Sequence, residues 1–412
     1  MYLENLDRSL IIIEIYQLFL FALILLFYGY KKTTSKKILA VFFLDAGIYY
    51  LALGMYYLGN YQITVLLYHF FVPAILALYP LFYLYVKSLT NQNFSLDSRK
   101  LFHFLPSLLF FLINTPVFVM LSPEQSKWFV IYGFTETGTG LLLQLVTKIY
   151  YLWNFVVFPL QIIFYTYLII KKIREHKNLI KELFSNLQKK QLNWLIWCIT
   201  LFFALLVINN ALLQTEALDD IIIRVGYNIS MIAITAFLGF AGLRQIDIYK
   251  EIADEEINHI DNKDIILADQ NENEIHQQNN ITKKGRNNKY VTSSLSEKEK
   301  EEIVSVLEYI MLTKKLFLNP DLKMTDIVSE ISLPRKQISQ VINENLNDNF
   351  YNYINRYRIE ESKRLLENIK FDRFSIEGIA KQSGFNSRSS FYAAFKNETG
   401  ITPSQFQHLC KT

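Results

Sequence analysis

Seven apolar stretches occupy the first part of this chain, and each is long enough to cross a membrane as a helix. A helix needs about 20 residues to span a hydrocarbon core roughly 30 Å thick. Buried helices of a large soluble protein are the alternative, but such helices normally keep a polar face, which these stretches mostly lack. The predicted spans are Ser9–Tyr30, Ile38–Leu58, Tyr61–Val86, Leu101–Leu121, Leu141–Ile170, Leu192–Leu213 and Ile221–Leu243. We therefore expect a seven-helix membrane domain over residues 1–243.

The distribution of Lys and Arg predicts how this domain is oriented, because short cytoplasmic loops carry an excess of both. The loops after the first, third and fifth spans contain Lys31, Lys32, Lys36, Lys37, Lys87, Arg99, Lys100, Lys171, Lys172, Arg174, Lys177, Lys181, Lys189 and Lys190. The N-terminus and the remaining loops contain Arg8 and Lys127, with Lys148 and Arg224 near the outer span ends. We expect a multi-pass protein of a bacterial inner (cytoplasmic) membrane, with the N-terminus outside and the C-terminal part in the cytoplasm.

The ionisable side chains within or at the ends of the spans include Glu14, Asp45, His69 and Arg224. Ionisable groups are costly in lipid and usually face the interior of a bundle, so each is a candidate for sensing a signal. Helix–helix hydrogen bonding or placement at the membrane interface is the alternative for each one. The predicted external loops are short, so we expect a ligand that is small, lipid-borne, or another membrane protein.

The sequence shows no familiar catalytic or metal-binding motif. Cys198 lies in an apolar stretch and Cys410 beside the C-terminus, which indicates neither a disulfide framework nor a metal cluster. The chain has no HExxH, GxSxG or P-loop sequence. We expect no catalytic residues, no bound metal and no cofactor, and therefore no enzyme. A net charge of +4 is too small to indicate a partner.

Residues 244–295 differ in composition from the spans. Arg244–Ile260 can form a helix with an apolar stripe, which would either pair two chains as a homodimer or form a solvated stalk. Asp261–Lys289 is rich in Asn, Gln, Asp and Lys and has little to bury, as is typical of a flexible linker. Ser296 and Glu299 then form a capping box, which predicts a helix to about Lys314.

Two helix-turn-helix patterns follow, separated by a long amphipathic helix. In Ser375–Pro403, Ser375 can cap a first helix, Gly384 can end it, and Ser387 can cap a second. Apolar residues recur at helical spacing in both helices and predict their inward faces. A similar pattern covers Met324–Asn345, and Phe350–Asn368 predicts the intervening helix.

The segment from about Leu316 to Phe406 resembles the DNA-binding domain of AraC-type transcription regulators. The resemblance depends on Ala380, Gly384, Phe385, Phe391, Phe395, Gly400 and Pro403 at the spacing of that family. It implies an all-α domain over residues 296–412, with two recognition helices that enter successive major-groove segments on one face of DNA. Lys323 departs from the family, which often has Ser or Thr there, so that helix cap is expected from Thr325 or is missing.

The resemblance also assigns individual side chains. Those transferred as contacts to base edges are Lys336, Ser339 and Gln340 in the first unit, and Arg388, Ser389, Ser390, Tyr392 and Ala393 in the second. Those expected to hold phosphate are Arg335, Asn386, Ser387 and Lys396. Ala393 stands where the family often has a longer polar residue, which weakens base reading by the second unit.

Together, these patterns predict an all-α protein in which a seven-helix membrane bundle precedes a cytoplasmic AraC-like domain. Its expected partners are double-stranded DNA and the lipid bilayer. The expected function is a membrane-anchored, sequence-specific transcription regulator that couples a membrane or external signal to promoter binding. Two alternatives stay open: a membrane transporter or enzyme with an autoregulatory DNA-binding domain, and a DNA-binding fold used for protein contacts.

Overall fold

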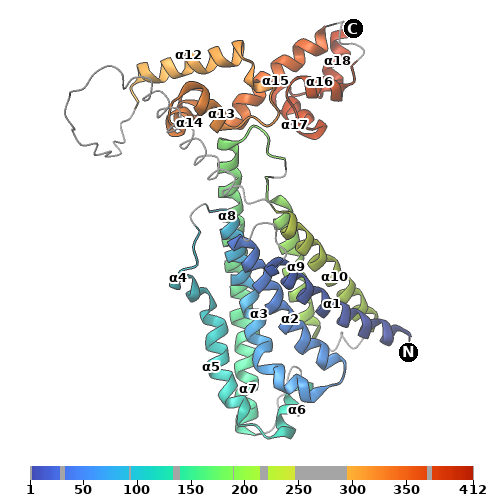
Figure 1. Ribbon diagram of the computed structural model, residues 1–412. Helices are drawn as coiled ribbons and strands as arrows, with labels where there is room; N and C mark the ends of the chain where they lie inside the picture. Colours follow the sequence, from blue (N-terminus) through green and yellow to red (C-terminus); the bar gives the residue numbers. More distant parts are fainter. Residues whose placement is uncertain are drawn as a thin grey trace, which may run out of the picture. The chain divides into compact units, whose positions relative to one another are not determined.

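The computed structural model describes residues 2–27, 33–91, 94–132, 140–188, 190–213, 221–245, 295–368 and 374–411, coloured along the sequence in Figure 1. These residues form helices and no β-strand. The chain divides into two compact units. The apolar unit comprises Met1–Glu175 and Leu192–Glu251, and the C-terminal unit comprises His176–Gln191 and Ile252–Thr412. The predicted juxtamembrane helix, its dimer contact and the linker lie almost wholly within residues 246–294, outside the described part.

The apolar unit contains long apolar helices together with shorter helices and turns. Their bounds are α1 Tyr2–Phe27, α2 Thr34–Tyr57, α3 Tyr61–Leu89, α4 Ser98–Leu101, the 3₁₀ turn η1 Phe102–Phe104, α5 Leu105–Val119, α6 Pro123–Tyr132, α7 Leu141–Leu152, the π-turn η2 Trp153–Val157, α8 Phe158–Leu183, α9 Asn193–Leu213 and α10 Ile221–Arg244. Among the described residues, six helical segments are long and apolar enough to cross a membrane. They are Tyr2–Phe27, Thr34–Tyr57, Tyr61–Leu89, Ser98–Val119, Leu141–Leu183 and Ile221–Arg244. The remaining predicted span corresponds to α9, whose apolar part Asn193–Ile208 is shorter, so a seventh span stays a prediction.

The fifth predicted span differs from the expectation in two ways. A π-turn, Trp153–Val157, interrupts it just before Pro159. Proline lacks an N–H group and clashes with the carbonyl four residues earlier, and a wider turn relieves both problems. The helix also continues to Leu183, beyond the predicted end of the span at Ile170. Lys, Arg and Glu are good helix formers, which allows α8 to extend beyond the apolar stretch.

Polar groups join α1 to α10 inside the apolar unit. Arg224 Nε donates to Asp7 Oδ2 at 3.0 Å, and Asn228 Nδ2 donates to Asp7 Oδ1 at 3.0 Å. Thr235 Oγ1 donates to Glu14 Oε1 at 3.1 Å, and Gln17 Nε2 lies 2.7 Å from the same hydroxyl. These bonds span more than 200 positions of sequence and hold the first helix against the last one of the unit.

The C-terminal unit confirms two helix-turn-helix pairs. After α12 Glu297–Thr313 and the 3₁₀ turn η4 Leu316–Leu318 come α13 Met324–Ile331, α14 Arg335–Glu344, α15 Phe350–Glu367, α16 Ile376–Gln382, α17 Arg388–Thr399 and α18 Pro403–Lys411. The pairs are α13–α14 and α16–α17, and α15 separates them along the chain (Figure 1).

The predicted caps of these helices are confirmed. Ser375 Oγ accepts from Gly378 N at 3.1 Å, and Ser387 Oγ accepts from Ser390 N at 3.2 Å. Ser296 and Glu299 form the expected capping box. At α13 the N-cap is Lys323, which makes no side-chain cap hydrogen bond, so the expected hydroxyl cap is missing and Thr325 does not supply it. Asp326 Oδ2 accepts from the backbone N–H of Lys323 at 2.7 Å, which is the reverse bond of a capping box.

Two hydrophobic cores fill the C-terminal unit, and α15 contributes to both. The first half of α15, with Tyr353 and Ile354, packs with α12, α13 and α14. The second half, with Ile359 and Leu365, packs with α16 and α17. Because one continuous helix supplies side chains to both cores, the two helix-turn-helix pairs are fixed relative to each other by α15.

The Arg358 side chain lies between these cores and is 1% exposed. Its Nε donates to Phe317 O at 2.7 Å, and Nη2 donates to Asn319 O at 2.7 Å. Its guanidinium also lies over the ring of Phe385, 5.8 Å from the centroid. Arg358 therefore joins the chain before the first pair to the turn of the second.

Gly384 lies in the turn between α16 and α17, where the backbone of that turn closely approaches Phe317 and Arg358. Its φ is +87°, and an added Cβ would clash with Phe317 O and lie 3.1 Å from Arg358 Nε. Gly400 has a similar φ of +79° but nothing within 4 Å of an added Cβ. Gly400→Ala should cost about 1–2 kcal/mol for its backbone conformation. Gly384→Ala should cost roughly 1–3 kcal/mol more for overpacking.

Denaturant unfolding of the C-terminal unit in the detergent-solubilised full chain measures both changes, because the unit also includes residues 176–191. Equal losses in the two variants would contradict the close approach at Gly384.

The Asp7–Arg224 pair gives a prediction for the apolar unit. The Asp7 side chain is 5% and the Arg224 side chain 19% exposed, so removing one partner takes this ion pair away from the charge that stays. Asp7→Asn and Arg224→Gln should each cost about 3 kcal/mol, toward the lower end for buried pairs. The double variant should lose less than the sum of the two. Thermal unfolding of the detergent-solubilised chain measures this, and additive losses would contradict a direct pair.

Candidate nucleic-acid interface

One side of α14 faces away from the core and carries the residues predicted to read DNA in the first unit. Ile338, Val341 and Ile342 are at most 1% exposed and fix the rotation of the helix. Lys336 is therefore exposed, and Ser339 and Gln340 are half-buried on the outward side. This placement agrees with the helical spacing on which the assignment depended, while the DNA contacts themselves stay predictions.

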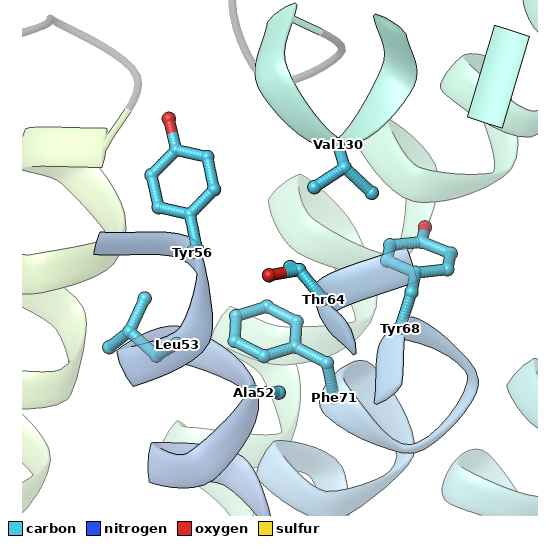
Figure 2. Close-up of a pocket in the computed structure, with 7 residues that line it drawn as sticks. All are labelled: Ala52, Leu53, Tyr56, Thr64, Tyr68, Phe71 and Val130. Atoms are coloured by element: carbon cyan, nitrogen blue, oxygen red, sulfur yellow. The ribbon is translucent and has the colours of Figure 1, made fainter. Parts of the chain in front are cut away.

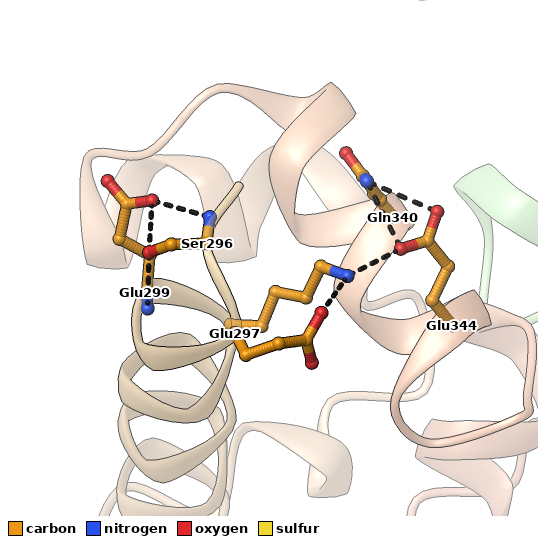
Figure 3. A network of polar contacts seen from close by, with 6 residues as sticks. Ser296, Glu297, Glu299, Gln340 and Glu344 are labelled. Atoms are coloured by element: carbon orange, nitrogen blue, oxygen red, sulfur yellow. Dashed lines mark hydrogen bonds and ion pairs between the residues drawn. The ribbon is translucent and has the colours of Figure 1, made fainter. Parts of the chain in front are cut away.

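A polar network holds Gln340 in place. Its Nε2 lies 3.1 Å from both carboxylate oxygens of Glu344 (Figure 3). Glu344 Oε2 also lies 3.1 Å from Lys300 Nζ on α12, and Lys300 pairs with Glu297 at 2.9 Å. These contacts, with the hydrogen bonds from Gln340 first, lower the pKa of Glu344. Gln340 Nε2 must leave Glu344 before the amide can form its bidentate pair with adenine.

The outward side of α17 is built in the same way. Phe391 and Phe395 are fully buried, at 0% exposure, so Arg388, Ser389 and Ala393 are exposed. Two of the other predicted base contacts are held locally. Tyr392 Oη lies 3.0 Å from Ser404 Oγ, and its ring lies 5.1 Å beneath the guanidinium carbon of Arg388. Ser390 Oγ lies 2.9 Å from Ser387 Oγ, the cap of the helix.

The four predicted phosphate contacts lie around the ends and exposed sides of these two helices. Arg335 begins α14, Ser387 caps α17, and Lys396 is exposed on the last turns of α17. Asn386 precedes the cap and its Nδ2 lies 3.5 Å from Asp321 Oδ1. Helix N-termini present free N–H groups to anions, which suits Arg335 and Ser387 to a phosphate backbone.

The structure adds residues that the sequence reasoning missed. Asn343 lies one turn beyond Ser339 on the outward side of α14, and the i, i+4 spacing would have indicated it. Glu182, near the end of α8, accepts hydrogen bonds at 3.1 Å from both Ser339 Oγ and Asn343 Nδ2. No local pattern predicts this contact, because the partners are 157 and 161 positions apart.

The four ionisable candidates of the apolar unit have different surroundings. Glu14 and Arg224 belong to the α1–α10 contacts described above. Asp45 Oδ2 and His69 Nδ1 are buried and have no hydrogen-bond partner within the described part of the chain. The His69 ring lies edge-on to Phe118 with centroids 5.2 Å apart. Within the described part of the chain no hydrogen bond or ion pair joins these four residues to one another, and their sensing roles stay predictions.

A small pocket opens elsewhere in the apolar unit (Figure 2). Its lining residues are Ala52, Leu53, Tyr56, Thr64, Tyr68, Phe71 and Val130, from α2, α3 and α6. The lining is apolar except for one hydroxyl and two phenol groups, and none of the four ionisable candidates belongs to it. Among the described residues no group of His, Cys, Asp and Glu could hold a metal ion.

Comparisons with known proteins cover part of the chain. A family model described as a helix-turn-helix domain matches residues 314–408. The Msm operon regulatory protein of Streptococcus mutans is 31% identical over 106 residues, which are 25% of this chain and 37% of that protein. A solved structure of a Listeria innocua protein of unknown function is 26% identical, with a TM-score of 0.23, over 26% of this chain and 95% of that one. The C-terminal end of this chain therefore carries an AraC-like helix-turn-helix domain of the kind found in DNA-binding transcription regulators.

Proposed function

We propose that this chain is a multi-pass protein of the cytoplasmic membrane that binds promoter DNA through its C-terminal unit and couples a membrane or external signal to transcription. The observation that carries the proposal is the presence, in one chain, of six helices with the length and composition of membrane spans and a paired helix-turn-helix domain. The distribution of Lys and Arg supports a cytoplasmic position for the second part.

The arrangement of α14 and α17 supports reading of two adjacent DNA segments. Each helix has a buried side that fixes its rotation, and α15 contributes to both cores. Successive major-groove segments on one face of DNA lie about 34 Å apart, so two readers on one rigid helix can occupy both. Lys336 and Arg388, exposed on these helices, can hydrogen-bond to guanine in the groove.

Mapping of the DNA bound by the intact, membrane-embedded protein across its genome tests the proposal directly. We expect enrichment at a small set of promoters that share a motif with two half-sites one helical turn apart. Uniform recovery of DNA, or recovery of none, would contradict sequence-specific binding by the chain.

Substitution of Lys336 and Arg388 separates sequence-specific base recognition from general electrostatic attraction to DNA. Lys336→Ala and Arg388→Ala should each weaken binding to the preferred DNA by about 1–3 kcal/mol, and relax the preference at one base position. Lys298→Ala is the matched control, because it removes the same charge from an exposed site on α12. Fluorescence anisotropy with preferred and scrambled DNA measures the difference, and unchanged affinities in both variants would favour a role in protein contacts.

The proposed orientation is testable with a native thiol. Cys410 is exposed near the C-terminus and Cys198 is buried. A membrane-impermeant maleimide should therefore label Cys410 only after the cytoplasmic membrane is opened, because the reagent reaches the cytoplasm only then. Cys410→Ser identifies the signal as that of Cys410. Full labelling in sealed spheroplasts would place the C-terminal unit outside and refute the orientation.

A further inference from the structure

Residues 176–191 belong to the C-terminal unit although they precede α9 in the chain. They comprise the end of α8 and the connection after it, and they pack closely against the helix-turn-helix domain. Phe184 and Ser185 are 3% and 2% exposed. Phe184 forms an antiparallel bridge with Lys323, and Ser185 N donates to Leu322 O at 3.2 Å. The segment is thus docked by its backbone as well as by side chains.

Arg358 anchors the same segment. Its Nη1 donates to Ser185 O at 3.1 Å, and its Nη2 donates to Ser185 Oγ at 2.9 Å. The guanidinium also bonds Phe317 O and Asn319 O, beside the first helix-turn-helix pair. A buried cation therefore connects residues 176–191 to the framework of the domain.

The position of the segment relative to the DNA-reading side chains is informative. Glu182 accepts hydrogen bonds from Ser339 and Asn343, on the outward side of α14. Farther along the segment, Ser185 and Asn186 line the same pocket as Ser389, Ser390 and Ala393 of α17. The segment therefore lies on the two helices at the side chains predicted to face bases.

We propose that residues 176–191 are an autoinhibitory segment that occupies the DNA-reading face of the C-terminal unit until DNA or a signal displaces it. This inference rests on the proposed function and adds its regulation. The major groove is about 12 Å wide and admits one helix, so α14 cannot enter it while Glu182 is bonded to Ser339. The Glu182 carboxylate also repels the phosphates that flank the groove.

The docked segment is continuous with the apolar unit through α8. Residues Phe158–Glu175 of this helix belong to the apolar unit, and His176–Leu183 belong to the C-terminal unit. A shift or rotation of α8 would therefore move Glu182 relative to Ser339. This gives a signal in the apolar unit a direct mechanical route to the DNA-reading face, by a bias between docked and released states.

The test compares the full chain in lipid nanodiscs with a fragment beginning at Ser296, on DNA selected from a random library by that fragment. The fragment lacks the segment and should bind more tightly than the full chain by about 5- to 150-fold, the usual range of such coupling. Glu182→Gln should raise the affinity of the full chain roughly tenfold, because a charge-assisted bond to α14 is lost.

Glu175→Gln is the matched control. It makes the same change on the same helix, and Glu175 pairs with Lys172 at 2.6 Å instead of with α14. Its DNA affinity should equal that of the wild-type chain. Hydrogen exchange gives a second readout in the unaltered full chain, because the Ser185 amide bonds Leu322 O and should lose protection when DNA is added.

Each of these measurements either supports or overturns autoinhibition by residues 176–191. Equal affinities of the full chain and the fragment, or Ser185 protection that persists on DNA, would overturn autoinhibition. Weaker DNA binding by the Glu182→Gln chain would indicate that the segment, with its lysines, is part of the DNA-binding surface. That result would also overturn autoinhibition. A fragment that circular dichroism shows to keep its helices but that selects no DNA would instead refute the proposed function, and the inference would fall with it.

Discussion

The C-terminal unit depends on one buried cation. Within the described residues no carboxylate bonds Arg358, and its donors meet neutral oxygens of Phe317, Asn319, Ser185 and Asn355. Burial lowers the pKa of its guanidinium to about 10, so the group stays charged near neutral pH. A buried charge is costly unless its hydrogen bonds are satisfied. The chain segments that supply those oxygens are therefore held in place around it.

The hydrogen bonds of Arg358 also help to explain how the domain holds its two recognition helices, α14 and α17. Apart from that of Asn355 on α15, the oxygens around Arg358 belong to the chain before α13, and its ring contact belongs to the turn between α16 and α17. With α15 shared by both cores, the two recognition helices have little freedom to move separately. Rigid placement of this kind reduces the entropy lost on binding, which favours recognition of a composite site.

Local features were predictable from the sequence, and long-range ones were not. The caps at Ser375 and Ser387 and the left-handed turn at Gly384 depend on a few neighbouring residues, so their signatures are visible in the chain. The bonds of Arg358 to Ser185 join positions 173 apart and leave no periodic trace. The extension of α8 was missed because hydropathy marks the end of an apolar stretch, which is a different quantity from the end of a helix. The base and phosphate contacts stay predictions.

The separation between buried and exposed sides of α14 and α17 has a consequence for how such a protein can evolve. Lys336, Arg388, Ser389 and Ala393 contribute little to the cores, because they project outward from helices fixed by Ile338, Phe391 and similar residues. Exposed positions usually tolerate replacement within about 0.5 kcal/mol. Successive substitutions there can retarget the chain to a new promoter while the scaffold, with Arg358 and Gly384 at its centre, keeps its stability. Binding preference and folding are thus free to change independently.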